Sequence, residues 1–325
     1  MSQAKKARLS DFGQHDLAIG CQLDKETVIA LTPVLGTISA ISAWAPVGNP
    51  AALDVHGSTH QSLSYIAIGT DAGCVMLVDN NRNVTKLEDC GGPPIQCMLI
   101  RDAAATAPMA AASTGNARSS SLPDIVACDS DGRVSVYTDR QMFARNVFSA
   151  PISAISLETN ANSPSCFIVG DLSGAVSAIH AQEVLWRAHV VTHERNERAE
   201  CLRPQAPAAM SDPGIAGVCS VQFLDNYGIL TSYVLAVAGE CLVQVISRGH
   251  PVLAVPTPSP CLALAAGRFV SGDAVDTRSS QAMVGDETGM LFVLDNFELI
   301  PYAQLDYPVT RVVSIPLRAF LGQRD

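Results

Sequence analysis

The residues whose type and spacing come nearest to a chemical motif are two histidines four positions apart. His189 and His193 stand beside Glu194 and Glu197, and on a helix an i, i+4 pair can direct both imidazoles at one metal ion. No glutamate takes the general-base place of a His-Glu-x-x-His motif, and the segment is polar, which favours solvated histidines. We predict no metal ion here, nor at a second and weaker histidine pair, His56 and His60.

Five aspartates lie in short turns between apolar runs: Asp71, Asp129, Asp131, Asp171 and Asp286. Gathered at one mouth of a β architecture, they could form a ring of carboxylates. Aspartate in such turns more often accepts hydrogen bonds from its own backbone, which fixes the turn. We favour this structural role over a carboxylate ring.

Sequence motifs for catalysis do not occur in the chain. It has no Gly-x-Ser-x-Gly nucleophile elbow, no P-loop and no dinucleotide fingerprint. Serine, histidine and aspartate are all present, but nothing in their order assembles a triad. We therefore predict no catalytic residue, no cofactor-binding residue, no metal-binding residue, no cofactor and no enzymatic activity.

The ten cysteines occur singly, and most of them lie inside apolar runs, which is typical of small buried hydrophobes. They are Cys21, Cys74, Cys90, Cys97, Cys128, Cys166, Cys201, Cys219, Cys241 and Cys261. The Cys-x-x-Cys spacing of zinc and dithiol sites is missing. This usage favours a reduced compartment such as the cytosol.

Charge and hydropathy exclude two classes of partner. Thirty-one acidic and 21 basic residues give a formal charge of -10, whereas binding to a phosphate backbone needs clustered cations. The longest apolar stretch, Tyr233–Ile246, falls short of the ~18 residues of a membrane span. The basic segment Met1–Arg8 is not followed by the apolar stretch of a secretory signal. We predict a cytoplasmic protein with no nucleic-acid partner and no direct membrane insertion.

The elements that must position these residues come from an internal repeat. Each copy is an apolar run, a short turn closed by glycine and a second apolar run, a pattern that predicts a β-hairpin. Four clear copies and two looser ones occur: Tyr65–Val78, Ile125–Tyr137, Phe167–Ile179 and Ala282–Leu294, then Leu17–Leu31 and Val234–Val245. The repeat therefore predicts six hairpins.

Two further strands complete each unit. A strand opened by proline or glycine follows every hairpin: Gly36–Ile41, Pro94–Met98, Pro151–Ile155, Gly217–Val221, Pro260–Leu264 and Pro308–Val312. Weaker polar and apolar stretches lie between them and predict outer edge strands: Gln141–Arg145, Glu183–Arg187 and Phe297–Ile300. Four-stranded units every ~40–50 residues indicate an all-β fold, a β-propeller of four-stranded blades. The competing parallel α/β sheet needs amphipathic helices, and no helical periodicity is present.

Ring closure and domain organisation follow from the same pattern. Pro308–Val312 could complete the first sheet and close six blades, or the chain could be a truncated seven-bladed ring; both alternatives stay open. We predict one propeller domain over residues 1–325 with two disordered surface insertions, at about 102–121 and 189–213. Both are polar and lack a strand pattern, and we expect them to contact partners.

Two repeat copies carry a more specific pattern. Val169–Ser177 and Val284–Gly289 share Val-Gly-Asp, any residue, Ser or Thr, and Gly. At these two segments the chain resembles FG-GAP-like β-propellers. Within that group it resembles the integrin-alpha FG-GAP repeat-containing subunit of the KICSTOR complex, and propeller subunits of the BBSome are the next nearest in style. The nearest calcium-type loop, Asp129–Gly132, lacks the further acidic ligands. The chain also has no Trp-Asp dipeptide and one Gly249-His250, which separates it from standard WD repeats.

The resemblance implies a non-enzymatic scaffold or interaction subunit whose partners are other protein subunits. It implies a regulatory complex in nutrient control of the TORC1 kinase, with peripheral placement at the lysosome or vacuole through partners. One alternative is a ciliary or vesicle-trafficking propeller subunit. Another is a propeller enzyme that uses the central channel, although the strands expected to line that channel are rich in alanine, serine and valine.

Overall fold

The computed structural model describes residues 21–22, 25–26, 36–44, 65–79, 83–89, 91–101, 123–158, 166–180, 182–190, 214–225, 227–269 and 279–312. Short strands β1 (Cys21–Gln22) and β2 (Lys25–Glu26) pair with each other in antiparallel fashion. The two strands predicted around them, within Leu17–Leu31, otherwise lie outside the described residues.

The remaining strands form five antiparallel sheets of four strands each, which we number as blades 1 to 5. Blade 1 is β3 (Ile38–Trp44), β4 (Tyr65–Thr70), β5 (Val75–Asp79) and β6 (Val84–Glu88); blade 2 is β7 (Ile95–Arg101), β8 (Asp124–Asp129), β9 (Arg133–Thr138) and β10 (Gln141–Val147); blade 3 is β11 (Ile152–Leu157), β12 (Cys166–Asp171), β13 (Ala175–His180) and β14 (Glu183–His189); blade 4 is β15 (Gly217–Leu224), β16 (Leu230–Val237), β17 (Leu242–Ser247) and β18 (His250–Pro256); blade 5 is β19 (Cys261–Gly267), β20 (Gln281–Asp286), β21 (Met290–Asp295) and β22 (Glu298–Gln304).

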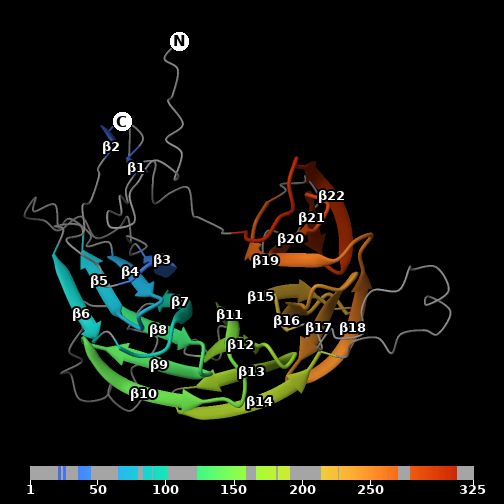
Figure 1. The fold of residues 1–325 in the computed structure, drawn as a ribbon. Coiled ribbons are helices and arrows are strands. Elements are labelled where there is room, and N and C mark those ends of the chain that lie inside the picture. The colour runs from blue at the N-terminus through green and yellow to red at the C-terminus, as the bar shows by residue number, and fades with distance from the viewer. Residues whose placement is uncertain are drawn as a thin grey trace, which may run out of the picture.

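The five sheets fan around a common axis, with β3, β7, β11, β15 and β19 innermost and β6, β10, β14, β18 and β22 outermost (Figure 1). Each innermost strand contacts the innermost strand of the next blade along the chain. No helix occurs among the described residues. The fold is therefore an all-β propeller, as the repeat predicted, and the α/β alternative is wrong.

Hydrophobic cores lie between neighbouring blades. The largest cluster joins blades 4 and 5, and the other large clusters join blades 3 and 4, 1 and 2, and 2 and 3. A single sheet cannot bury both of its faces, so each blade depends on its neighbours for stability.

Five of the six predicted hairpins and five of the six predicted innermost strands are confirmed. The last predicted strand, Pro308–Val312, is wrong: these residues form no strand. Val309 donates a backbone hydrogen bond to the carbonyl of Asp286 at 2.9 Å, as Ile215 does to Asp171 at 3.0 Å. The segment thus packs against blade 5 in the way that the chain entering blade 4 packs against blade 3. Closure of the ring lies outside the described residues.

The two predicted insertions fall at blade connections. Residues 102–121 lie between β7 and β8 and are outside the described residues. The second insertion begins later than predicted, because His189 is the last residue of β14 and Val190 is buried with its amide bonded to Gly174 at 2.9 Å. Residues 191–213 are outside the described part of the chain.

Close approach of adjacent blades explains the glycine next to the last residue of the second strand in three blades. A Cβ on Gly170 would overlap the side chain of Ile215, and one on Gly285 would overlap Val309. In each case a β-branched residue that follows the blade fills the space above the glycine. The equivalent position in blade 2 is the buried Cys128. Small residues are therefore required here by packing between blades.

β-Bulges recur at fixed places in the sheets. The outermost strand of every described blade carries one, at Leu87, Phe143, Leu185, Val252 and Tyr302. The innermost strands of blades 1, 2, 3 and 5 carry one near their start. The innermost strand of blade 4 pairs without a bulge over its full length. Blade 4 therefore departs from the pattern of the other four.

The antiparallel topology gives the ring two distinct faces. The turns between second and third strands lie on one face, which we call the turn face. The connections from first to second strands, including the insertion at 102–121, lie on the opposite face, which we call the loop face. Two-residue hairpin turns at Asp139–Arg140, Arg248–Gly249 and Asn296–Phe297 also lie there, all with positive φ, as a type I′ turn requires.

Candidate functional site

The predicted histidine cluster is not assembled in the described structure. His189 is exposed at the end of β14, whereas His193, Glu194 and Glu197 lie outside the described residues, as do His56 and His60. Within the described part of the chain, no group of three or more His, Cys, Asp or Glu side chains is arranged to hold a metal ion.

The turn aspartates serve as caps. Asp171 Oδ1 accepts hydrogen bonds from the backbone amides of Ser173 and Ala175, at 2.9 and 3.0 Å. Asp129 and Asp286 accept the equivalent bonds in their own turns. Their buried carboxylates are thus engaged with the backbone that they fix, and the structural role predicted for these three is confirmed.

The two exposed aspartates of the set differ from the prediction, because their partners are not amides of their own turns. Asp71 Oδ1 accepts a hydrogen bond from the Thr37 amide at 2.7 Å. Asp131 lies 3.2 Å from the Arg133 guanidinium. The five aspartates therefore belong to four separate turns, since Asp129 and Asp131 share one.

Most described cysteines behave as the buried hydrophobes that the sequence predicts. Cys128, Cys166, Cys219 and Cys261 are buried free thiols. Burial raises the pKa of each, to about 11 for Cys166 and Cys261, so these thiols are poor nucleophiles at neutral pH. Cys74 is buried as predicted but is bonded in a disulfide, and Cys241 departs from the prediction because it is exposed.

The feature that distinguishes one blade is an extended hairpin on the loop face. In blade 4, β15 and β16 stay paired from Gly217 opposite Val237 to Leu224 opposite Leu230. β16 begins three residues before Tyr233, which the register places opposite Ser247, the last residue of β17; in the other blades the second strand begins at this level. At ~3.3 Å per residue, the hairpin projects about 10 Å beyond that level.

The tip of this hairpin carries a hydrogen-bonded turn and exposed apolar side chains. Asp225 Oδ1 accepts hydrogen bonds from the amides of Tyr227 and Ile229, at 2.9 and 2.8 Å, and Gly228 takes the positive φ that the turn needs. The Tyr227 side chain is 89% exposed and Ile229 is 60% exposed, with Leu230 beside them. A fixed turn therefore presents large apolar side chains to solvent.

Blade 5 supports the hairpin from one side. The ring of Phe297 packs edge-on against Phe223 and Tyr233, with centroids 5.0 and 5.2 Å apart. The amide of Leu224 donates to Asn296 Oδ1 at 2.9 Å. Aromatic pairs of this geometry add roughly 0.5–1.5 kcal/mol each beyond buried area. The hairpin is thus held against the type I′ turn of its neighbour.

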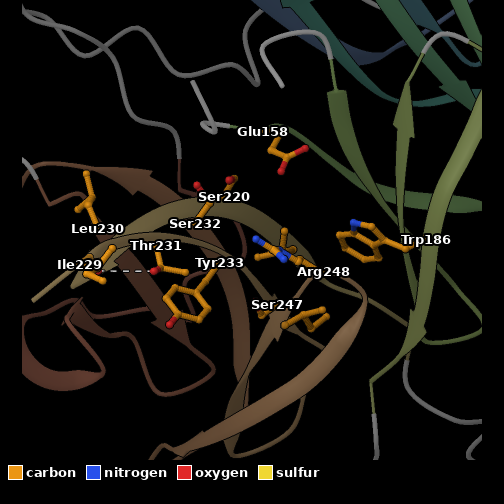
Figure 2. Close-up of a pocket in the computed structure, with 12 residues that line it drawn as sticks. Glu158, Trp186, Ser220, Ile229, Leu230, Thr231, Ser232, Tyr233, Ser247 and Arg248 are labelled. Carbon is orange, nitrogen blue, oxygen red and sulfur yellow. Dashed lines mark hydrogen bonds between the residues drawn. The ribbon is translucent and has the colours of Figure 1, made fainter. Parts of the chain in front are cut away.

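A cavity of about 310 Å³ lies on the other side of the hairpin, between blades 3 and 4 (Figure 2). Glu158, just after β11, and Trp186 of β14 reach it from blade 3, and Arg248 reaches it from the β17–β18 turn. Its remaining lining comes from blade 4: Ser220, Ile229, Leu230, Thr231, Ser232, Tyr233, Val234, Ile246 and Ser247. The wall is part polar and part apolar.

Close packing fixes one side of the cavity. A Cβ on Gly249 would overlap Trp186 Cβ, so the turn that carries Arg248 rests directly on the tryptophan. Burial raises the pKa of Glu158, and a hydrogen bond from the Cys166 thiol partly opposes this rise. Figure 2 shows the carboxylate of Glu158 and the guanidinium of Arg248 directed into the same space.

The neighbouring loop-face polar groups are satisfied by one another. Arg101 Nε lies 3.2 Å from Asp124 Oδ2, both buried, and Thr138 Oγ1 donates to Asp124 Oδ1 at 2.9 Å. The guanidinium carbon also stands 5.7 Å above the Phe167 ring. This cluster ties blade 2 to blade 3 and has a structural role.

Sequence reasoning missed both the extended hairpin and the cavity. The hairpin has a readable signal, the turn residues Asp225-Asn-Tyr-Gly228 between two β-rich runs. The cavity has no such signal, because Glu158 and Arg248 are far apart in the chain and come together only through the stacking of blades.

No helix in the described structure is long and apolar enough to cross a membrane.

Fold and site together define a β-propeller with an extended loop-face hairpin beside a part-polar cavity. No protein-family model and no curated protein matches the sequence.

Among solved structures, the chain is similar to BBS1N in complex with ARL6DN. In the mercury-soaked crystal the TM-score is 0.54 at 14% identity, over 86% of this chain and 70% of that one. In the lead-soaked crystal it is 0.53 at 13% identity, over 88% and 74%. The computationally designed Ika8 protein matches with a TM-score of 0.48 at 15% identity, over 94% and 70%. At these identities the BBS1N likeness shows the propeller fold.

Proposed function

We propose that this chain is a non-enzymatic interaction subunit that binds a partner protein through the blade 4 hairpin. The observation that carries the proposal is the exposed apolar tip, Tyr227, Ile229 and Leu230, on a turn fixed by Asp225. Rigid, exposed tyrosine and aliphatic side chains are typical anchors of protein interfaces, because little conformational entropy is lost when they are buried.

The composition of the innermost strands supports a non-enzymatic role. Across β3, β7, β11, β15 and β19, the sole charged residue is Arg101, and it is paired with Asp124. Catalysis in a central channel would need titratable groups that converge on it. The alternative of a channel enzyme is therefore less favoured, and a broad hydrolase screen on the purified protein would test it.

The narrower form of the proposal concerns the assembly. The FG-GAP-like segments Val169–Ser177 and Val284–Gly289 support the assignment of this chain to a cytoplasmic regulatory complex in nutrient control of TORC1. The fold likeness to BBS1N, which was solved with ARL6DN, supports the competing assignment to a ciliary or vesicle-trafficking complex. The two assignments differ in the partner, so identification of the partner separates them.

Site-specific crosslinking tests the hairpin as the interface. A photo-crosslinking phenylalanine analogue replaces Tyr227 in the full chain in cells, and the same analogue replaces Tyr307 as the control. Tyr307 is 79% exposed and follows β22 near the turn face. We expect a discrete protein adduct from position 227, weakened by Ile229→Ser, and no such adduct from position 307. Equal adducts at both positions, or none at 227, would contradict the proposal.

A further inference from the structure

We propose that the cavity between blades 3 and 4 binds a small zwitterion that carries one carboxylate and one ammonium group, the chemistry of a free amino acid. Its volume of about 310 Å³ falls at the lower end of the range for small-molecule sites. The inference goes beyond the proposed partner binding and does not depend on it.

Two opposite charges on separate walls carry the proposal. Glu158 extends from blade 3 and Arg248 from blade 4 into the cavity (Figure 2). They form no ion pair with each other, and Arg248 forms none with any other described residue. A ligand with both charges can satisfy both side chains at once, because a guanidinium binds carboxylate and a carboxylate binds ammonium.

The contrast with the next blade interface strengthens this reading. On the loop face at blade 2, Arg101 and Asp124 stand on neighbouring strands and satisfy each other, fully buried. At the cavity, the acid and the base belong to different blades and face a space between them. Arg101 and Asp124 therefore neutralise each other, whereas Glu158 and Arg248 can each pair with a charge on a ligand in the cavity.

The rest of the lining fits the same ligand class. Hydroxyls of Thr231, Ser232 and Ser247 line the cavity, and Trp186 adds an indole N–H donor. Ile229 and Leu230 form the opposite, apolar end (Figure 2). The charged head of an amino acid would lie between Glu158 and Arg248, with an apolar side chain toward the hairpin.

Ligand-observed NMR on the purified full chain, with each proteinogenic L-amino acid in turn at millimolar concentration, tests binding. We expect saturation transfer to at least one of them, followed by titration calorimetry for its Kd. Its amine and its carboxylic acid, which each lack one charge, should bind at least about tenfold more weakly. Absence of binding by every amino acid overturns the proposal, as does equal binding of either singly charged analogue.

Paired variants place the ligand in the cavity. Glu158→Gln and Arg248→Asn should each raise the Kd at least about tenfold; asparagine tolerates the positive φ of position 248. The matched control is Arg140→Asn, at the equivalent type I′ turn of blade 2, which should leave the Kd unchanged. Thermal melting confirms that each variant is folded, and Glu158→Asp replaces Glu158→Gln if the latter is not. Equal effects of Arg140→Asn and Arg248→Asn overturn the assignment.

The pH dependence gives an independent readout. Burial raises the pKa of Glu158, and protonation removes the charge that attracts ammonium. Binding should therefore weaken as the pH falls from neutral toward that raised pKa, and Glu158→Gln should abolish this trend. A wild-type Kd that is unchanged over this range overturns the assignment of the ammonium group to Glu158. The crosslink at position 227 reports partner binding alone, so the two proposals fail separately.

Discussion

Asp286 shows how a single side chain can fix a blade turn. Its Oδ1 accepts from the amides of Thr288 and Met290, and its Oδ2 from the Ser259 hydroxyl. Burial alone would raise its pKa, but these hydrogen bonds to the carboxylate together lower it. Because the folded pKa lies below the unfolded one, the charged carboxylate stabilises the fold above the unfolded pKa.

The acid stability of the protein should depend on this residue. The stabilisation from Asp286 is lost as the pH falls through its lowered folded pKa. We predict that Asp286→Asn reduces the free energy of unfolding at neutral pH and flattens its decline in acid, as measured by urea unfolding at a series of pH values. Asp306→Asn, at an exposed residue, is the control and should keep the wild-type slope. A wild-type slope in Asp286→Asn would contradict the prediction.

At the scale of single residues, the sequence could predict which aspartates cap turns. An aspartate followed by glycine three residues later, as at Asp171 and Gly174, indicates a capped turn because the bonds involved are local. The glycine one residue before the cap, as at Gly170 and Gly285, carries no such local signal. Gly170 accommodates Ile215, which is distant in sequence and belongs to the start of the next blade. Local pattern cannot reveal a contact of that kind.

Stacking of one blade on the next can be tested at this glycine. Gly170→Ala places a methyl group against Ile215, and we predict a loss of about 1–3 kcal/mol in the free energy of unfolding, measured with urea. Gly170→Ala combined with Ile215→Ala should cost less than the sum of the two single variants, because the second change opens space for the first. Additive losses would show that the two residues do not share a contact.

Strands and hairpins were predicted well where apolar runs are bounded by glycine turns. The extension of blade 4 was not predicted: the turn residues Asp225-Asn-Tyr-Gly228 signal a hairpin, but the mixed polar and apolar run Leu230-Thr-Ser-Tyr233 does not show how far its strands stay paired. Its pairing depends on an unbulged partner strand and on Phe297 of blade 5, neither of which local sequence shows. The error at Pro308–Val312 is of the opposite kind. This segment has the sequence pattern of a strand, but within the described residues it does not pair with another strand.

At the scale of the whole molecule, the insertion at 102–121 should be separable from the fold. Arg101 and Asp124 face each other in the register of β7 and β8, so a short turn can join the two strands. We predict that replacing residues 102–122 with a short Gly-Ser linker leaves the melting temperature unchanged or slightly higher, because loop closure then costs less entropy. A large drop in melting temperature would show that the insertion contributes to the core.

The stacking of four-stranded blades around an axis could be predicted from the period of the repeat, but the side chains that meet on the surfaces of these blades could not. Periodicity specifies that four-stranded units stack around an axis. It does not specify that Glu158 and Arg248 face one cavity, since that depends on the angle between two blades.

The bulges in the outer strands restrict how another protein can approach the rim. A flat, regular edge would expose a row of backbone amides and carbonyls, on which a foreign strand could extend the sheet. The bulges interrupt that row, and those at Phe143, Leu185, Val252 and Tyr302 carry exposed apolar side chains. A partner that binds the rim must therefore recognise side chains rather than the backbone. The same bulges prevent copies of the propeller from pairing edge to edge into continuous sheets.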